Sequence, residues 1–382
     1  MNARRPRTRS RVGPVVLVVV VAVTALAAAA LVAGARRGSP PDVAPDPAHV
    51  ADGNVAAASS PTPDRHGDAP AVVPPTVDPA SLPLRSERQV RAEPEVVDGV
   101  KVFRLTAEAV RWEFLPGVEV TAWGYNGQVP GPEIWVDQGD RVRVELDNRL
   151  PVPTTIHWHG VDVPNRMDGV PGVTQDPILP GESFVYEFVA EPSGSFWYHS
   201  HADSARQLDM GLYGAFIVRG HDEPAYDHDV VQIVDEWIRL PDGRNGWEGV
   251  AHAGHNPGEY NWFTINGKSF PETEELAVAE GDRVRVRVIN AGFQAHPMHQ
   301  HGERFRVIAK DGAPLPQPYL ADTVLVGAGE RYDYEFVAEA GAWMFHCHIP
   351  HHTGNDTVEP GGLMTFVTTE EYRGASRKHQ HE

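Results

Sequence analysis

Apolar and polar residues alternate in two stretches of the chain that are nearly identical. Residues 139–148 have the sequence GDRVRVELDN, and residues 281–290 have the sequence GDRVRVRVIN. Alternation with a period of two predicts a strand that is buried on one face only. Other short alternating runs lie between turns rich in glycine and proline, of which the chain has 36 and 34. The pattern therefore predicts an all-β protein.

The segments around these two strands are repeated as well. IHWHG returns as MHQHG, ESFVYEFVA returns as ERYDYEFVA, and FWYHSH returns as WMFHCH. We interpret the repeat as one Greek-key β-sandwich duplicated in tandem. Domain 1 is expected at residues 95–222, domain 2 at residues 228–372, and a polar tail at residues 373–382.

The amino terminus has the pattern of an export segment. Five arginines within the first 11 residues precede an uncharged stretch from Val12 to Ala35. This stretch is long enough to span a membrane and longer than the apolar part of most signal peptides, so residues 1–37 are either a membrane anchor or a cleaved signal peptide. Residues 38–94 are rich in proline, alanine and aspartate, which predicts a disordered linker. Both interpretations place the domains outside the cytoplasm, secreted or anchored to the outer face of the cell membrane.

The charge of the chain and its single cysteine exclude several classes of protein. A formal net charge of −19 argues against nucleic acid as a partner. One cysteine cannot form a disulfide within the chain. It is therefore an inert buried residue, a ligand or a nucleophile.

Four His-x-His pairs carry the candidate chemistry. In an extended strand, residues i and i+2 point to the same face, so each pair presents two imidazoles together. The pairs are His157 with His159, His199 with His201, His299 with His301, and His346 with His348. Eight imidazoles exceed the four ligands that zinc takes, so we expect a multinuclear transition-metal centre where the two domains face each other.

The single cysteine, Cys347, lies between His346 and His348 and therefore points away from both imidazoles. A thiolate with two imidazoles and a weak axial methionine is the ligand set of a blue-copper electron-transfer site. The candidates for the other positions are His296 for one imidazole, His351 or His352 for the second, and Met364 or, as the alternative, Leu363 for the axial position. The peptide bonds of Cys347 would join this site to the multinuclear centre.

These clusters resemble the four copper-binding signatures of the multicopper oxidases, the laccase-like family. The strings HWHG, YHSH, HPMHQHG and HCHIPHH occur in the family's order, and the similarity covers residues 95–370. The resemblance implies two cupredoxin domains and four coppers per subunit equivalent. It implies His157 and His299 on the type 2 copper, His159, His199, His201, His301, His346 and His348 on the type 3 pair, and His296, Cys347, His352 and Met364 on the type 1 copper.

The chain departs from the common pattern of this family in its domain number and in one loop. It has two predicted domains rather than three, and Ser200 stands in domain 1 where Cys347 stands in domain 2. The chain therefore resembles the two-domain laccases, with a type 1 site in domain 2 only. The loop TGNDTVEPGGL before Met364 is also longer than in many relatives.

Asp168 follows the first His-x-His pair, where the family often carries a carboxylate close to the type 2 and type 3 coppers. We interpret it as a proton relay for dioxygen reduction. The alternative is that Asp168 only forms the turn before Gly169.

The resemblance implies a copper-dependent oxidoreductase. Its partners would be dioxygen, which is reduced to water, and a reducing substrate that is phenolic, aromatic or a low-valent metal ion. A copper nitrite reductase-like enzyme and a non-catalytic copper-binding protein of the same fold are the alternatives. Because each domain supplies four histidines and two-domain relatives form trimers, we expect a homotrimer with each trinuclear cluster between neighbouring subunits.

Overall fold

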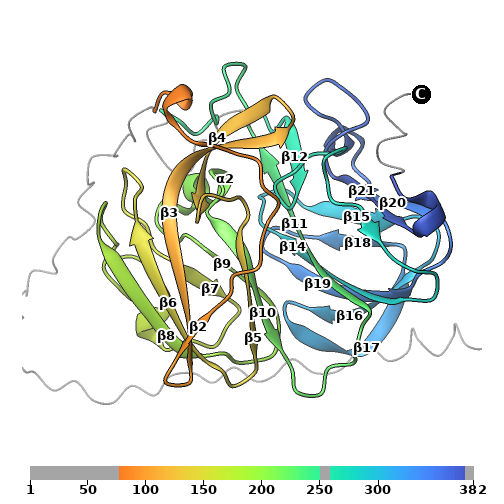
Figure 1. Cartoon of the computed structure of the whole chain (residues 1–382), viewed down its shortest axis with the longest axis horizontal. Coiled ribbons are helices and arrows are strands. Elements are labelled where there is room, and N and C mark those ends of the chain that lie inside the picture. Colours follow the sequence, from red (N-terminus) through yellow and green to blue (C-terminus); the bar gives the residue numbers. More distant parts are fainter. Residues whose placement is uncertain (1–76, 250–258, 375–382) are drawn as a thin grey trace, which may run out of the picture. The chain divides into compact units, whose positions relative to one another are not determined.

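The structure, a computed structural model, describes residues 77–249 and 259–374. Its first half is a sandwich of two sheets (Figure 1). One sheet has the order β1-β3-β6-β8, with β2 and β4 also paired to β3, and the other has the order β5-β10-β9-β7. The bounds are β1 Leu84–Arg85, β2 Glu95–Val97, β3 Val100–Leu115, β4 Val118–Tyr125, β5 Gly131–Asp137, β6 Arg141–Asn148, β7 His157–His159, β8 Ser183–Val189, β9 Gly194–His199 and β10 Tyr213–Arg219. The helical elements of this half are η1 Pro79–Ser81, η2 Asn165–Met167 and α2 Ser204–Asp209.

The second half is another two-sheet sandwich. Its sheets have the orders β12-β11-β14-β19-β16-β17 and β13-β21-β20-β15-β18. The bounds are β11 His228–Trp237, β12 Trp262–Ile265, β13 Leu276–Ala277, β14 Arg283–Asn290, β15 His296–Gln300, β16 Phe305–Lys310, β17 Ala313–Ala321, β18 Thr323–Val326, β19 Arg331–Val337, β20 Ala342–Cys347 and β21 Met364–Thr368. Two short helices, η3 Pro350–Thr353 and η4 Glu370–Tyr372, complete it. The prediction of two tandem all-β sandwiches is confirmed.

The repeated strands β6 and β14 end in asparagines with the same function. Asn148 and Asn290 are both buried, and the oxygen of each side chain accepts a hydrogen bond from the backbone two residues on. Each side-chain amide donates to two carbonyls; these belong to Val152 and Ile178 in domain 1 and to Gln294 and Val326 in domain 2. A buried side-chain amide that satisfies the backbone hydrogen-bonding groups of a loop fixes the path of the chain. The asparagines therefore set the position of the first His-x-His strand in each domain.

An apolar cluster joins the two halves. From domain 1 it contains Trp112 and Phe114, and from domain 2 it contains Trp237 and Trp262, all buried. Phe114 contacts both tryptophans of domain 2, with ring centroids 5.3 and 5.7 Å apart. Trp112 Nε1 donates to the carbonyl of Gly267 at 2.6 Å. The halves therefore share a core as well as a chain.

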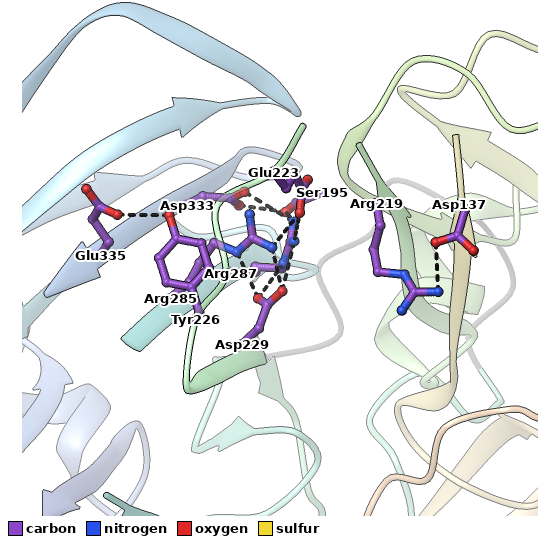
Figure 2. A network of polar contacts seen from close by, with 10 residues as sticks. All are labelled: Asp137, Ser195, Arg219, Glu223, Tyr226, Asp229, Arg285, Arg287, Asp333 and Glu335. Atoms are coloured by element: carbon purple, nitrogen blue, oxygen red, sulfur yellow. Dashed lines mark hydrogen bonds and ion pairs between the residues drawn. The ribbon is translucent and has the colours of Figure 1, made fainter. Parts of the chain in front are cut away.

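A network of charges lies beside this core and is drawn in Figure 2. Arg287 of β14 has no exposed side-chain area, and its guanidinium donates to Ser195 Oγ of β9 at 2.7 Å and to Asp229 Oδ1 at 2.8 Å. Ser195 in turn donates to Asp333 Oδ1 at 2.6 Å. Burying a charged group is costly unless it is paired and hydrogen-bonded. The bonds of Arg287 meet that need and connect domain 1 to domain 2.

The ends of the chain bear on three predictions. The predicted signal or anchor segment lies outside the described residues, as do most of the linker at residues 38–94 and of the polar tail. The last part of the predicted linker belongs to the fold of domain 1, because β1 already pairs with β3 and the backbone N–H of Val90 donates to Gln128 Oε1. Among the described residues, no helix has the length and hydrophobicity to cross a membrane.

Candidate metal centres

Domain 1 gathers its four histidines at one end of the sheet β5-β10-β9-β7. The antiparallel register of β7 and β9 sets His157 opposite His199, and the ligand atoms of His157, His159 and His199 lie within 4.8 Å of one another. His159 Nδ1 and His199 Nε2 are 3.3 Å apart. The ring of His201 lies beside them, with its centroid 5.5 Å from that of His157.

Domain 2 repeats this arrangement. The register of β15 and β20 sets His299 opposite His346, and these two residues form a second group with His301. The Nε2 atoms of His301 and His346 are 3.0 Å apart. The ring centroid of His348 is 5.5 Å from that of His299. Each domain therefore gathers four histidines in a similar arrangement.

Backbone carbonyls fix the tautomer of one histidine in each half. His157 Nδ1 lies 2.8 Å from the carbonyl oxygen of Asp168, and His299 Nδ1 lies 2.8 Å from that of Asp322. Because a carbonyl can only accept, both Nδ1 atoms must carry the hydrogen. The Nε2 lone pairs are then free to bind a metal. Sequence reasoning missed Asp322, because its backbone carbonyl makes the contact with His299.

Burial lowers the pKa of four of these histidines, which favours the neutral form that binds a metal. Burial and, second, the charge of Arg331 lower the pKa of His159 to about 3. Burial also lowers the pKa of His199 well below its ordinary value. In domain 2, burial lowers the pKa of His301 and of His346.

The side chain of Asp168 also lies close to His157, the histidine that its backbone carbonyl contacts. Its Oδ1 lies 3.3 Å from His157 Nδ1, and its side chain is one-third exposed. The corresponding distance from Asp322 Oδ1 to His299 Nδ1 is 3.8 Å. Asp168 therefore has contact both with a predicted type 2 ligand and with solvent.

A third group, made of His296, Cys347 and His352, lies inside domain 2 and is almost fully buried. Cys347 Sγ is 3.4 Å from His352 Nδ1 and 3.8 Å from His296 Nδ1, and the two Nδ1 atoms are 3.1 Å apart. Burial raises the pKa of Cys347 to about 11 and lowers that of His352 to about 3. Of the two candidates for the second imidazole, His352 belongs to this group, whereas His351 is exposed.

The pairing of β20 with β21 bears on the axial position. His346 is opposite Met364, and the backbone N–H of Cys347 donates to the carbonyl of Leu363 at 2.9 Å. Opposed residues of antiparallel strands share a face, and successive residues alternate. Leu363 accordingly packs in the same apolar cluster as Cys347, whereas Met364 packs with Phe270 and Phe366. The thiol therefore has Leu363 beside it, on the face opposite to Met364.

The two histidine halves do not meet within the described part of the chain. Each of the three groups of ligand atoms comes from a single domain. A cavity of about 260 Å³ opens beside the histidines of domain 1, and its domain 2 wall consists of Ala291, Gly292, Phe293, Ala328 and Gly329. None of the domain 2 histidines lines this cavity.

Comparisons with known proteins agree with this geometry. A family model described as multicopper oxidase matches residues 106–223, and a second one matches residues 248–360. The chain belongs to the multicopper oxidase family.

Two solved structures and a curated relative give the extent of the similarity. The crystal structure of the blue copper oxidase from Nitrosomonas europaea is 37% identical with a TM-score of 0.66, over 71% of this chain and 86% of that one. The multicopper oxidase mgLAC is 39% identical with a TM-score of 0.65, over the same shares. Laccase-2 of Botryotinia fuckeliana is 36% identical over 252 residues, which are 59% of this chain and 41% of that protein. The chain thus spans less than half the length of this curated relative.

Copper is the metal that this family implies, and the donor atoms fit it. Each histidine group presents ring nitrogens that lie within 4.8 Å of one another. The third group adds a thiol to two imidazoles, which is the donor set of a blue-copper site.

Proposed function

We propose that the protein is a laccase-like oxidase, which couples one-electron oxidation of a reducing substrate to the four-electron reduction of dioxygen to water. When bound, copper supplies the electron transfers and the oxygen chemistry. The observation that carries the proposal is the position of Cys347: its side chain belongs to the buried group, while the side chain of His346 belongs to the histidine group of domain 2. One peptide bond thus connects the two kinds of centre.

The proposed ligands follow the sequence analysis with one change. His157 and His299 would hold the type 2 copper, and His159, His199, His201, His301, His346 and His348 the type 3 pair. His296, Cys347 and His352 would hold the type 1 copper, for a total of four coppers per subunit equivalent. Met364 would not be a ligand, because the strand pairing places Leu363, which has no donor atom, beside Cys347 instead.

We further propose that the eight-histidine site forms between subunits of a homotrimer. The separation of the two halves within one chain supports this, because each half needs four more histidines. A head-to-tail contact between copies brings domain 1 of one subunit to domain 2 of the next, and such contacts can close into a ring.

A complementation experiment tests the shared site. A His157→Ala, His159→Ala double variant lacks part of the domain 1 half, and a Cys347→Ser variant lacks the type 1 thiol of domain 2. Co-expression of the two should restore part of the oxidase activity, since some interfaces then combine two intact halves. A fully active monomer in light scattering, or no activity in verified mixed trimers, would contradict the shared site.

The proposed location is outside the cytoplasm. Its support is the arginine-rich start followed by an apolar stretch up to Ala35. Attachment to a membrane depends on whether this segment is cleaved, which amino-terminal sequencing of the mature protein measures.

Copper analysis and oxygen consumption test the central proposal. The copper-loaded protein should contain four coppers per chain, absorb strongly in the visible region and consume one dioxygen per four electrons taken from a phenol. Reduction of nitrite without oxygen consumption would favour the nitrite reductase alternative. Copper binding with neither activity would favour a binding protein.

A further inference from the structure

A buried carboxylate that belongs to no copper signature lies beside the third group. Glu236 is in β11, far in the sequence from the ligands, and neither its side chain nor that of His296 has any exposed area. Glu236 Oε2 is 2.9 Å from His296 Nε2. A buried carboxylate is costly unless every lone pair that faces the protein finds a donor.

The second oxygen of Glu236 is held by the loop that leads into β15. Its Oε1 accepts hydrogen bonds from the backbone N–H groups of Phe293 and Gln294, both at 2.6 Å. Gly292 precedes this pair, and a Cβ there would collide with the carboxylate of Glu236. The loop is therefore shaped around the carboxylate, and it leads directly into β15, which begins at His296.

This contact decides which nitrogen of His296 carries the hydrogen. Glu236 already accepts two backbone hydrogen bonds at Oε1, and as an acceptor at Oε2 as well it receives the hydrogen bond of His296 Nε2. The Nδ1 lone pair then faces Cys347 Sγ at 3.8 Å and His352 Nδ1 at 3.1 Å. The two imidazoles of the group differ in this respect, because His352 Nε2 is buried without a hydrogen-bond partner in the described part of the chain.

We propose that Glu236 is a positioning residue of the type 1 centre, which holds His296 in the tautomer that binds copper and makes its imidazole a stronger donor to Cu(II). The proposal rests on the proposed function, since it assumes copper at this group. A carboxylate that draws on the Nε2 hydrogen raises the basicity of the ligand. Negative charge close to the metal also favours the more highly charged oxidised form. Glu236 therefore lowers the reduction potential of the type 1 copper.

The same carboxylate reaches the wall of the domain 1 cavity. Gly292 and Phe293, which surround Glu236 Oε1, also line the cavity beside the domain 1 histidines. Glu236 thus fixes a type 1 ligand and, through the same loop, one side of the neighbouring histidine site.

The chain offers a matched control for Glu236 in the next residue. Asp235 is equally buried, but it points to the opposite face of β11 and accepts a hydrogen bond from Tyr213 at 2.6 Å. Asparagine at this position keeps an acceptor for Tyr213. Burial raises the pKa of Asp235 well above its ordinary value, and Asp235→Asn keeps the size of the side chain.

Glu236→Gln is the principal test, on the copper-loaded protein. The amide has one acceptor oxygen, so its NH₂ group must face either His296 Nε2–H or the two backbone N–H groups. Copper affinity at the type 1 site should fall about 10–100-fold, as for other residues that orient a ligand. The visible absorption of the remaining type 1 copper should shift, and its reduction potential should rise. Asp235→Asn should leave all three unchanged.

Glu236→Asp separates contact from charge. It keeps the carboxylate but shortens the side chain by one methylene, so it should lose copper affinity like Glu236→Gln while its potential rises less. This variant also serves if Glu236→Gln does not fold, as judged by circular dichroism. Wild-type affinity, absorption and potential in a folded Glu236 variant, or equal changes in Asp235→Asn, would overturn the proposal.

Nitrogen NMR of the copper-free protein gives a readout that does not depend on the proposed function. His296 should be the Nε2–H tautomer in the unaltered protein and in Asp235→Asn, and should populate the Nδ1–H tautomer in Glu236→Gln. The same tautomer of His296 in all three proteins would contradict the proposed role of Glu236. Failure of the unaltered protein to give a blue copper band would instead count against the oxidase function.

Discussion

In domain 2, Cys347 and His296 lie next to each other beneath the His-x-His strands, and in domain 1 the same positions hold Ser200 and Thr154. The side chains occupy equivalent places: Ser200 Oγ is 3.2 Å from Thr154 Oγ1, and Cys347 Sγ is 3.8 Å from His296 Nδ1. All four residues are buried. The surroundings, and not the backbone, distinguish a candidate metal site from a structural one.

The domain 1 position is satisfied by its own hydrogen bonds. Gln207 of α2 accepts from Thr154 Oγ1 at 2.8 Å and from Ser200 Oγ at 2.5 Å, and Ser200 Oγ also accepts from the backbone of Ala202. In domain 2, η3 replaces this helix and brings His352 into the group. Three atoms that can each bind a metal then converge: the sulfur of Cys347 and the Nδ1 atoms of His296 and His352.

The largest expected effect comes from making domain 2 resemble domain 1 at one atom. Cys347→Ser should remove the intense thiolate-to-copper absorption and the oxidase activity, because a hydroxyl does not replace a thiolate as a copper ligand. The fold should persist, since Ser200 occupies the equivalent buried place in domain 1. Visible absorption, oxygen uptake and circular dichroism measure the three outcomes, and a Cys347→Ser protein that stayed blue would refute the assignment.

The two acids beside the histidine halves should differ in their effects. Asp168→Asn should slow reoxidation of the reduced protein by dioxygen about 100-fold, the lower end of what a positioned proton donor contributes. The backbone carbonyl of Asp168 still holds His157 in this variant, so reduction by substrate should keep its rate.

Asp322→Asn is the matched control. Its carboxylate is farther from its histidine, at 3.8 Å, and more exposed. Stopped-flow reoxidation should therefore change less than in Asp168→Asn. Equal rates in both variants and the unaltered protein would leave Asp168 with only its role in the turn.

The axial position gives a smaller effect. Leu363→Met places a thioether beside the thiol and should lower the type 1 reduction potential, because the axial ligand tunes that potential. A fall of about 60 mV would change the electron-transfer equilibrium about tenfold. Met364→Leu should change neither potential nor absorption, since Met364 packs on the opposite face with Phe270. Redox titration measures the type 1 potential of both variants. A changed potential in Met364→Leu with an unchanged one in Leu363→Met would identify Met364 as the axial ligand.

The sequence predicted the parts of the site that depend on strand periodicity. Alternation placed His346 and His348 on one face and Cys347 on the other, and the structure groups these side chains accordingly. The sequence did not identify the axial residue, because the long loop before Leu363 and Met364 leaves the register of β21 undetermined. Only the pairing with β20 shows which of the two shares a face with Cys347.

The residues that support the site were not predictable from the sequence. Glu236 lies within a strand of buried residues and belongs to no motif, and it reaches His296 only because β11 passes the loop before β15. Asp322 likewise reaches His299 through its backbone carbonyl, which leaves no trace in the side-chain pattern. Contacts between segments 20 to 60 residues apart depend on the folded arrangement of the sheets.

The smallest expected effect on activity lies in the hydrogen-bond network of domain 1. Ser200→Ala removes a hydroxyl that bonds Thr154 and Gln207, so it should lower the free energy of unfolding by about 1–2 kcal/mol. It should change neither the blue absorption nor the activity, because this position holds no proposed ligand. Ser183→Ala is the control, since Ser183 makes one exposed hydrogen bond to Asp147 and should cost less than about 0.5 kcal/mol. Denaturant unfolding measures both. Equal costs for the two serines, or a loss of type 1 copper in Ser200→Ala, would mean that the buried hydroxyl does not play the structural part that distinguishes domain 1 from domain 2.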